Sequence, residues 1–309
     1  MSAGDSDDER PADGVEVGGV EAGSAASEPV GDVGTAPALS AVADPPWTAP
    51  EWTPVPPTPP AVSPEFSFSR PAQPPRRTHR WGIGAYVLVE IVFLGTSLLL
   101  ALLFMRGEGE GEASSAGQLA LSLAVPTMVA ASLAVVITLV RGNGPFVDLR
   151  LSWSWRDIGI GLAFGLGGLF VTIPASIVYS MIVGEEASSA VGSAFAEVRA
   201  NPVTAVAIFA TVALLAPLCE EIVYRGLLWG SIERLGVGPW VAFGVTTLLF
   251  ALAHFEFTRT PLLLIVAIPI ALARVYTGRL LASIVAHQVN NLLPALVLVL
   301  GVLGALPVA

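Results

Sequence analysis

The segment VTAVAIFATVALLAPLCEEIVYRG, residues 203–226, combines a long apolar run with three charged side chains. Glu220, Glu221 and Arg225 lie in sequence that is otherwise apolar enough to enter a lipid bilayer. Each such charge costs about 2.5–3.5 kcal/mol on insertion scales. Because charged residues inside membrane spans usually mark functional sites, we expect this segment to form one wall of an active site buried in the membrane.

The whole chain is unusually apolar. Of its 309 residues, 53% are hydrophobic and 13% are charged, whereas soluble domains carry about 25% charged residues. Several apolar runs of about 20 residues predict an all-α fold, a polytopic helical bundle in a membrane. We expect about seven transmembrane helices, at residues 81–105, 119–140, 158–183, 203–235, 240–255, 262–275 and 280–306.

The chain divides by composition into three parts. Residues 1–75 are rich in Ala, Gly, Pro and acidic residues, which predicts a disordered acidic tail. Residues 76–202 hold three transmembrane helices with their loops, and residues 203–309 hold the core helices that carry the candidate site. Arginines cluster just before the first span, so the positive-inside rule places the tail in the cytoplasm.

Charge and residue usage exclude several kinds of protein. The net charge of −10 comes largely from the tail, because residues 1–80 carry twelve acidic residues and five arginines. The sequence shows no cluster of basic residues of the kind that favours nucleic-acid binding. The single cysteine, Cys219, excludes an intrachain disulfide and a cysteine-based metal cluster. Every basic residue is an arginine, which excludes lysine chemistry. This composition indicates a multi-pass protein of a bacterial cell membrane.

Helical geometry separates the two adjacent glutamates. In an α-helix Glu221 and Arg225, four residues apart, share a face and can pair, which reduces the cost of burying both. Glu220 lies about 140° from Arg225 around the helix, so it is left to face another direction. We therefore expect Glu220 to be the reactive carboxylate. Tyr224, four residues further on, could donate a hydrogen bond to it.

Two other apolar spans supply polar partners. Glu220 precedes the break at residues 236–239 by about fifteen residues, and His254 follows it by about fifteen. If the two spans form an antiparallel hairpin, both side chains therefore lie at a similar depth in the membrane. His287 and Asn291 share one face of the last span. A glutamate and a histidine can activate a water, while a histidine and an amide can donate to an oxyanion. No cofactor is required by this pattern, but Glu220, His254 and His287 could instead ligate zinc. The sequence leaves both mechanisms open.

Three motifs in these spans resemble those of the CPBP family of intramembrane proteases. This is the CAAX-protease and bacteriocin-processing group, also called the Abi family. The motifs occur in the family's order: Glu-Glu-x-x-x-Arg at residues 220–225, Phe-x-x-x-His at 250–254 and His-x-x-x-Asn at 287–291. Each is weak alone, but three in order within apolar spans are specific. The resemblance covers about residues 200–300.

The resemblance implies roles for the matching residues. Glu220 and His254 would position and activate the water, and Glu221 with Arg225 would support the site. His287 and Asn291 would stabilise the oxyanion. The implied activity is an intramembrane endopeptidase acting, among membrane lipids, on a peptide or a membrane-protein substrate.

Other interpretations remain open at this level. The protein could be a non-catalytic membrane scaffold, or a bacteriocin-immunity or regulatory protein of the same family. It could also be a transporter whose Glu and His side chains relay protons. Among single residues, Arg274 and Arg279 are expected to be cytoplasmic orientation charges and Phe250 a packing residue. Glu90 interrupts the first span, and no partner for it is evident in the sequence.

Overall fold

The computed structural model describes residues 78–107 and 115–306. The predicted tail, residues 1–75, lies outside the described residues. Within them every regular element is helical, which confirms the all-α fold. The long helices of the first half are α1 (Ile83–Gly107), α2 (Ala116–Arg141) and α4 (Trp155–Val183). Short elements complete the first half: α3 (Pro145–Asp148), η1 (Gly184–Ala187) and α5 (Ala190–Phe195).

The second half of the chain holds one long composite helix followed by three single ones. The composite comprises α6 (Pro202–Ala210), η2 (Thr211–Leu215), α7 (Ala216–Glu221), η3 (Ile222–Leu228) and α8 (Trp229–Glu233). The single helices are α9 (Pro239–Leu252), α10 (Thr260–Thr277) and α11 (Leu280–Val302).

Six of the described helices, rather than the seven expected, are long and apolar enough to cross a membrane. The exception is the span expected at residues 240–255, where α9 has only 14 residues. At 1.5 Å per residue α9 extends about 21 Å, less than the roughly 30 Å of a bilayer's apolar core. It ends early because the chain turns at Ala253, and Phe255 then adopts a left-handed conformation with φ of 55°.

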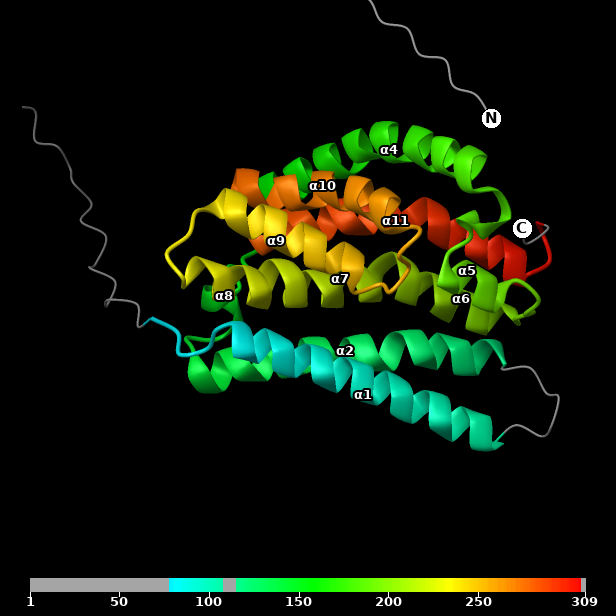
Figure 1. Ribbon diagram of the computed structural model, residues 1–309, viewed down its shortest axis with the longest axis horizontal. Helices are drawn as coiled ribbons and strands as arrows, with labels where there is room; N and C mark the ends of the chain where they lie inside the picture. Colours follow the sequence, from blue (N-terminus) through cyan, green and yellow to red (C-terminus); the bar gives the residue numbers. More distant parts are fainter. Residues whose placement is uncertain (1–77, 108–114, 307–309) are drawn as a thin grey trace, which may run out of the picture. The chain divides into compact units, whose positions relative to one another are not determined.

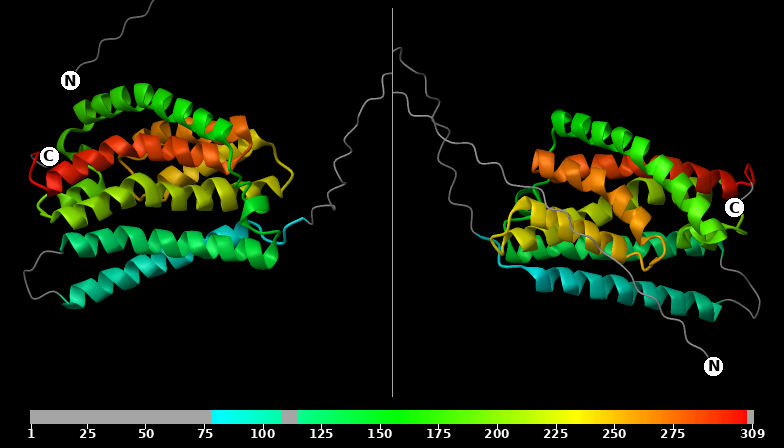
Figure 2. Two further views of the ribbon diagram at one scale, coloured as in Figure 1. Left: turned by 180° about the vertical axis from the view of Figure 1, so that it is seen from behind. Right: turned by 45° about the horizontal axis from the view of Figure 1, so that its top comes forward.

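The helices form layers around the composite helix (Figure 1). The α1–α2 pair packs on one side of it, through contacts of α2 with α7 and of α1 and α2 with η3. On its other side lies α11, which packs beside α10, and α4 covers both. The rear view in Figure 2 shows the same order, with α4 and the α1–α2 pair on opposite sides. The candidate segment is therefore enclosed at the centre of the bundle.

The composite helix departs from the regular α-helix that the predicted directions of its side chains assume. The segments η2 and η3 are π-helical, a form that occurs mostly as short insertions in α-helices and is frequent at functional sites. Pro217 follows η2 and has no N–H to donate to a preceding carbonyl. Two side chains of α11 donate to carbonyls of η2 instead: Asn291 to Val212 at 3.1 Å and Gln288 to Leu214 at 3.2 Å.

Glycines bring α4 against the helix that carries His287 and Asn291. A Cβ added at Gly161 would lie 2.6 Å from the carbonyl oxygen of Ala282 and 2.7 Å from Cβ of Val285, both on α11. Gly165 approaches Val289 in the same way. This close approach is the packing expected of a glycine-rich span.

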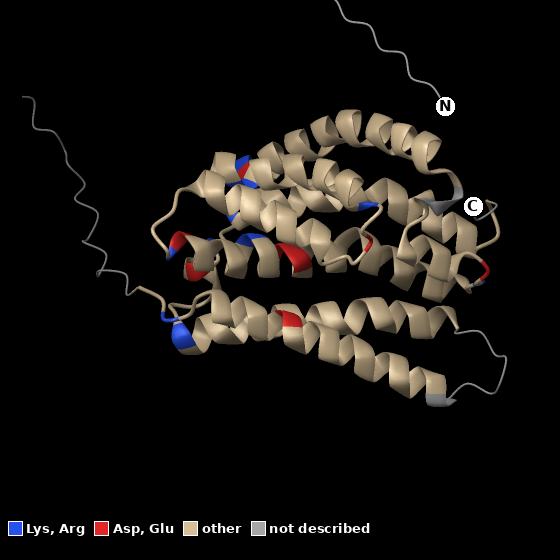
Figure 3. Ribbon diagram, viewed as in Figure 1, with Lys and Arg blue, Asp and Glu red and all other residues tan. Residues whose placement is uncertain are grey.

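The outer surface of the bundle is apolar. Large side chains are exposed along the spans, among them Phe170 at 84% and Met181 at 79% on α4. In a soluble protein such a surface would favour aggregation, whereas here it matches the apolar interior of a bilayer. Charged residues are sparse along the spans and gather mainly toward one end of the bundle (Figure 3).

Candidate active site

A fully buried ion pair forms the floor of the candidate site. Arg225 Nη1 donates to Glu221 Oε1 at 2.7 Å, and both side chains are 0% exposed. This is the i,i+4 pair that the spacing predicts, and it forms although Arg225 lies in a π-helical segment. The guanidinium also lies 4.6 Å from the ring centre of Phe250, a cation–π contact. We call Glu221 and Arg225 the brace.

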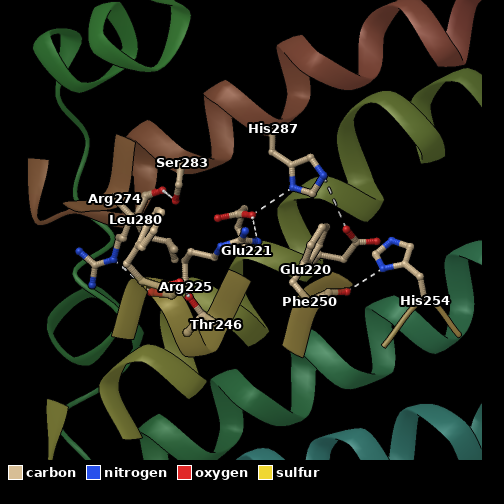
Figure 4. Close-up of polar contacts among 11 residues, drawn as sticks. Glu220, Glu221, Arg225, Thr246, Phe250, His254, Arg274, Leu280, Ser283 and His287 are labelled. Carbon is tan, nitrogen blue, oxygen red and sulfur yellow. Dashed lines mark hydrogen bonds and ion pairs between the residues drawn. The ribbon is translucent and has the colours of Figure 1, made fainter. Parts of the chain in front are cut away.

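His287 joins the brace to the second glutamate (Figure 4). Its Nδ1 lies 3.0 Å from Glu221 Oε1, and its Nε2 lies 3.7 Å from Glu220 Oε2. Because Arg225 pairs with Glu221, that carboxylate is ionised and only accepts, so Nδ1 carries the proton. In the neutral ring Nε2 is then an acceptor that faces Glu220.

Glu220 and Glu221 differ in exposure. The side chain of Glu220 is 25% exposed, while that of Glu221 is 0% exposed. Figure 4 shows the Glu220 carboxylate pointing away from the brace, toward the side where the rings of His254 and His287 lie. Glu220 is therefore the carboxylate of the pair that a water or a substrate can reach.

His254 lies in the turn after α9 rather than inside a span. Its Nδ1 lies 2.8 Å from the Phe250 carbonyl oxygen, which only accepts, so Nδ1 carries the proton and Nε2 of the neutral ring is an acceptor. The residue is exposed, and the left-handed Phe255 follows it. Strained backbone of this kind is frequent next to functional sites.

Phe250, on α9, contacts several side chains of the candidate site. Its ring makes edge contacts with His254 at 4.8 Å, with His287 at 5.5 Å and with Tyr224 at 5.4 Å between ring centres. Only 3% of it is exposed. The expectation that Phe250 is a packing residue agrees with these contacts, and its neighbours are the candidate site residues themselves.

The two asparagines of α11 have separate partners. Asn291 donates through Nδ2 to the Val212 carbonyl, so one of its two amide hydrogens is used within the bundle. Asn290 faces the other way and accepts from the Thr172 hydroxyl of α4 at 3.3 Å. Asn291 thus lies on the composite-helix side of α11, with one N–H left to donate.

Sequence reasoning missed two polar residues near the site. Arg274, expected to be an orientation charge, is 2% exposed, and its Nε donates to the Arg225 carbonyl at 3.1 Å. Ser283 lies near Glu221, one turn before His287, and donates to the Leu280 carbonyl. Its four-residue spacing from His287 could have indicated it. Nothing in the local pattern around Arg274 could have indicated its burial, because that burial depends on contacts with the composite helix, at the Arg225 carbonyl and the Trp229 ring.

The geometry does not favour the zinc alternative. In the described part of the chain, no three His, Cys, Asp or Glu side chains lie close enough together to hold a metal ion. Glu220, His254 and His287 therefore do not form a ligand set here. Zinc requires ligand atoms at about 2.0–2.2 Å from one common point.

Comparisons with known proteins match the part of the chain that holds the candidate site residues. A family model described as Type II CAAX prenyl endopeptidase Rce1-like matches residues 202–293, which include every candidate site residue. The membrane-embedded CAAX protease MroQ of Staphylococcus aureus (strain USA300) is 33% identical over 85 residues. The aligned part covers 26% of this chain and 34% of that relative, so the match spans about a third of the relative's length. No solved structure matches the chain significantly.

The matched residues are those that carry the three sequence motifs, so the comparisons confirm the resemblance drawn from them. Residues 202–293 are therefore similar to the Type II CAAX prenyl endopeptidase Rce1-like family.

Proposed function

We propose that the protein is an intramembrane endopeptidase in which Glu220 activates a water that attacks a peptide bond. The observation that carries this proposal is the opposite environment of the two adjacent glutamates. Glu221 is closed off and paired with Arg225, whereas Glu220 is 25% exposed and lies 3.7 Å from His287 Nε2. An accessible carboxylate beside imidazole acceptors is an arrangement that can hold and deprotonate a water.

Each side chain has a distinct part in this proposal. Glu220 takes the proton of the attacking water. The Nε2 atoms of His254 and His287 are both acceptors in the neutral tautomers, and one of them can orient that water by accepting its second hydrogen. Glu221 fixes the His287 ring through Nδ1, and Arg225 holds Glu221 in place. The free N–H of Asn291 is the donor available to the developing oxyanion, since donation from His287 Nε2 would require the doubly protonated ring.

The substrate class follows from the surroundings of the site. The site lies among membrane spans, and MroQ is named a CAAX protease. We propose a peptide segment at or within the bilayer as the substrate, in a bacterial cell membrane. Arginines at several helix ends meet at one end of the bundle: Arg234 donates to the Trp81 carbonyl, and Arg150 pairs with Glu233. By the positive-inside rule this end, and with it the N-terminus, faces the cytoplasm.

A peptidase assay tests the proposal against the scaffold and transporter alternatives. Purified protein in liposomes is incubated with a panel of fluorogenic peptides, with Glu220→Gln as the test variant. Glu233→Gln is the matched control, because Glu233 lies in the same composite helix but outside the site. We expect cleavage by the wild type and by the control, and none by Glu220→Gln. Equal activity of all three proteins would refute the role of Glu220. We also expect activity to persist with a zinc chelator, and a loss reversed by added zinc would contradict the metal-free mechanism.

A further inference from the structure

The turn that carries His254 is tied to the rest of the bundle two residues later, at Glu256. The Glu256 carboxylate has two partners: Oε1 accepts from the Ala190 N–H of α5 at 2.5 Å, and Oε2 pairs with Arg259 Nη1 at 2.6 Å. The Glu256 carbonyl also accepts, from the Arg259 N–H at 3.0 Å and from the Thr260 hydroxyl at 3.1 Å. One residue thus links the turn after α9 both to α5 and to the beginning of α10.

The groups that hold Glu256 are themselves part of the packed bundle. On α5, Phe195 is only 1% exposed and belongs to a buried cluster with Ala116 of α2 and Ile208 of α6. The side chains of Glu256 and Arg259 are 14% and 18% exposed, so solvent screens their ion pair less than it screens a surface pair. Glu256 therefore connects the turn to fixed elements of the fold.

His254 needs a constraint from outside its own helix. Its Nδ1 hydrogen bond and its ring contact with Phe250 both go back to α9, so they do not tie the turn to another element. Phe255, between His254 and Glu256, has a left-handed φ of 55°, and a non-glycine residue keeps such a conformation only where the surrounding structure imposes it. The hydrogen bonds of Glu256, the next residue, supply that constraint.

We propose that Glu256 is a positioning residue of the candidate site, which fixes the place of the His254 ring by tying the turn after α9 to α5 and α10. The inference rests on the proposed function, in which His254 Nε2 is an acceptor that can orient the attacking water. It extends the support of the site to α5, which lies outside the matched residues 202–293.

NMR of protein labelled at the histidine nitrogens tests the inference without an activity assay. The chain has only three histidines, and His79→Gln and His254→Gln assign their signals. In the wild type, the Phe250 carbonyl holds the proton of His254 on Nδ1, so the two ring nitrogens should give separate, fixed shifts. In Glu256→Ala we expect the His254 shifts to move toward an average of both tautomers. The signals of His79 and His287 should stay in place and serve as internal controls.

Peptidase kinetics on the same proteins test the consequence for the reaction. We expect Glu256→Ala to lower kcat by between about tenfold and about 100-fold with KM unchanged, because a displaced water-orienting group affects the chemical step. Glu197→Ala is the matched control, since Glu197 is an exposed glutamate two residues after α5, and it should behave as the wild type. If Glu256→Ala yields too little folded protein, Glu256→Gln, which keeps one acceptor oxygen, should show the same changes at smaller size.

Three results would overturn the inference: unchanged His254 shifts in Glu256→Ala, a change in the signals of all three histidines, or equal effects of Glu197→Ala and Glu256→Ala. Failure of the proposed function gives a different pattern, namely an active Glu220→Gln. Moved His254 shifts together with a wild-type kcat would confirm that Glu256 holds the turn, and would refute the role of His254 in the proposed function.

Discussion

Glu220 and Glu221 are neighbours in the chain, yet they belong to two different regions of the bundle. Glu221 lies in the closed region, with Arg225 and the Nδ1 side of His287 around it. Glu220 lies in the open region, with the exposed His254 and the Nε2 side of His287. Successive side chains on a helix point in directions about 100° apart, so two adjacent residues can have different surroundings. The comparison shows how one helix can supply both a buried brace and an accessible carboxylate.

The closed region is not optimised for stability. Within the described residues, Glu221 Oε2 and the Nε and Nη2 atoms of Arg225 are buried without a hydrogen-bond partner. Apolar residues often replace a buried ion pair at no loss of stability, so the pair is weak evidence for a stabilising role. We interpret it as the group that fixes the ring of His287.

The largest expected effect lies in the open region. Glu220→Gln should lower kcat by about 10²–10⁴-fold, because it removes the proposed general base. The thermal unfolding midpoint should stay near that of the wild type, since the side chain is partly exposed and its Oε2 lies 3.7 Å from His287 Nε2, beyond hydrogen-bond distance. Peptidase kinetics and thermal unfolding in detergent measure the two effects. A large loss of stability in Glu220→Gln would contradict the expected difference between Glu220 and Glu221.

The next effect lies in the closed region. Glu221→Gln leaves Arg225 buried without its counter-ion and should destabilise the protein by about 3–5 kcal/mol. The measurement is folded yield and thermal unfolding after membrane extraction. Replacing both residues by leucine should recover much of the stability but not the activity, because His287 loses its Nδ1 acceptor. Normal yield of Glu221→Gln with lost activity would contradict the division between the regions.

A smaller effect should follow from moving α11, which supplies His287 to both regions. Gly161→Ala places a methyl group 2.6 Å from the Ala282 carbonyl oxygen, so α4 and α11 must separate. We expect destabilisation by about 1–3 kcal/mol, as for other overpacked sites, and a lower kcat. Gly159→Ala is the matched control, since a Cβ there meets nothing within 4 Å. The prediction fails if the two variants unfold at the same temperature.

The smallest effect concerns Asn291. Asn291→Ala removes the hydrogen bond to Val212 and the proposed oxyanion donor, and should lower kcat by about tenfold or less. Gln288→Ala also removes a side-chain donor to η2 from a residue of the same intermediate burial, and it serves as the control. Steady-state kinetics of both variants test the point. If Gln288→Ala lowers kcat as much, the effect comes from η2 and not from an oxyanion contact.

Much of the fold was predictable because membrane insertion depends on local composition. The six long helices follow the apolar runs closely, since a span needs about 20 apolar residues and satisfies its own backbone hydrogen bonds. The fifth run was predicted too long. Its apolar residues continue toward Phe255, but the helix ends at Leu252 because of a backbone turn that hydropathy does not register.

Part of the site was also predictable, namely the pairs within one helix. The spacing of Glu221 and Arg225 fixes their contact even in a π-helical segment, because four residues still return to nearly the same face. The local spacing failed at Arg274, where packing of α10 buries a side chain that was expected to be an orientation charge.

By itself, the sequence determined that the chain is a membrane bundle, that Glu220, Glu221 and Arg225 lie inside it, and that Glu221 pairs with Arg225. Only the tertiary structure decided that His287 lies between the two glutamates and that Glu220 is the accessible one. The physical reason is the range of the interactions. Contacts within a helix follow from its periodicity, whereas contacts between helices depend on which faces pack together, and the whole bundle sets that packing.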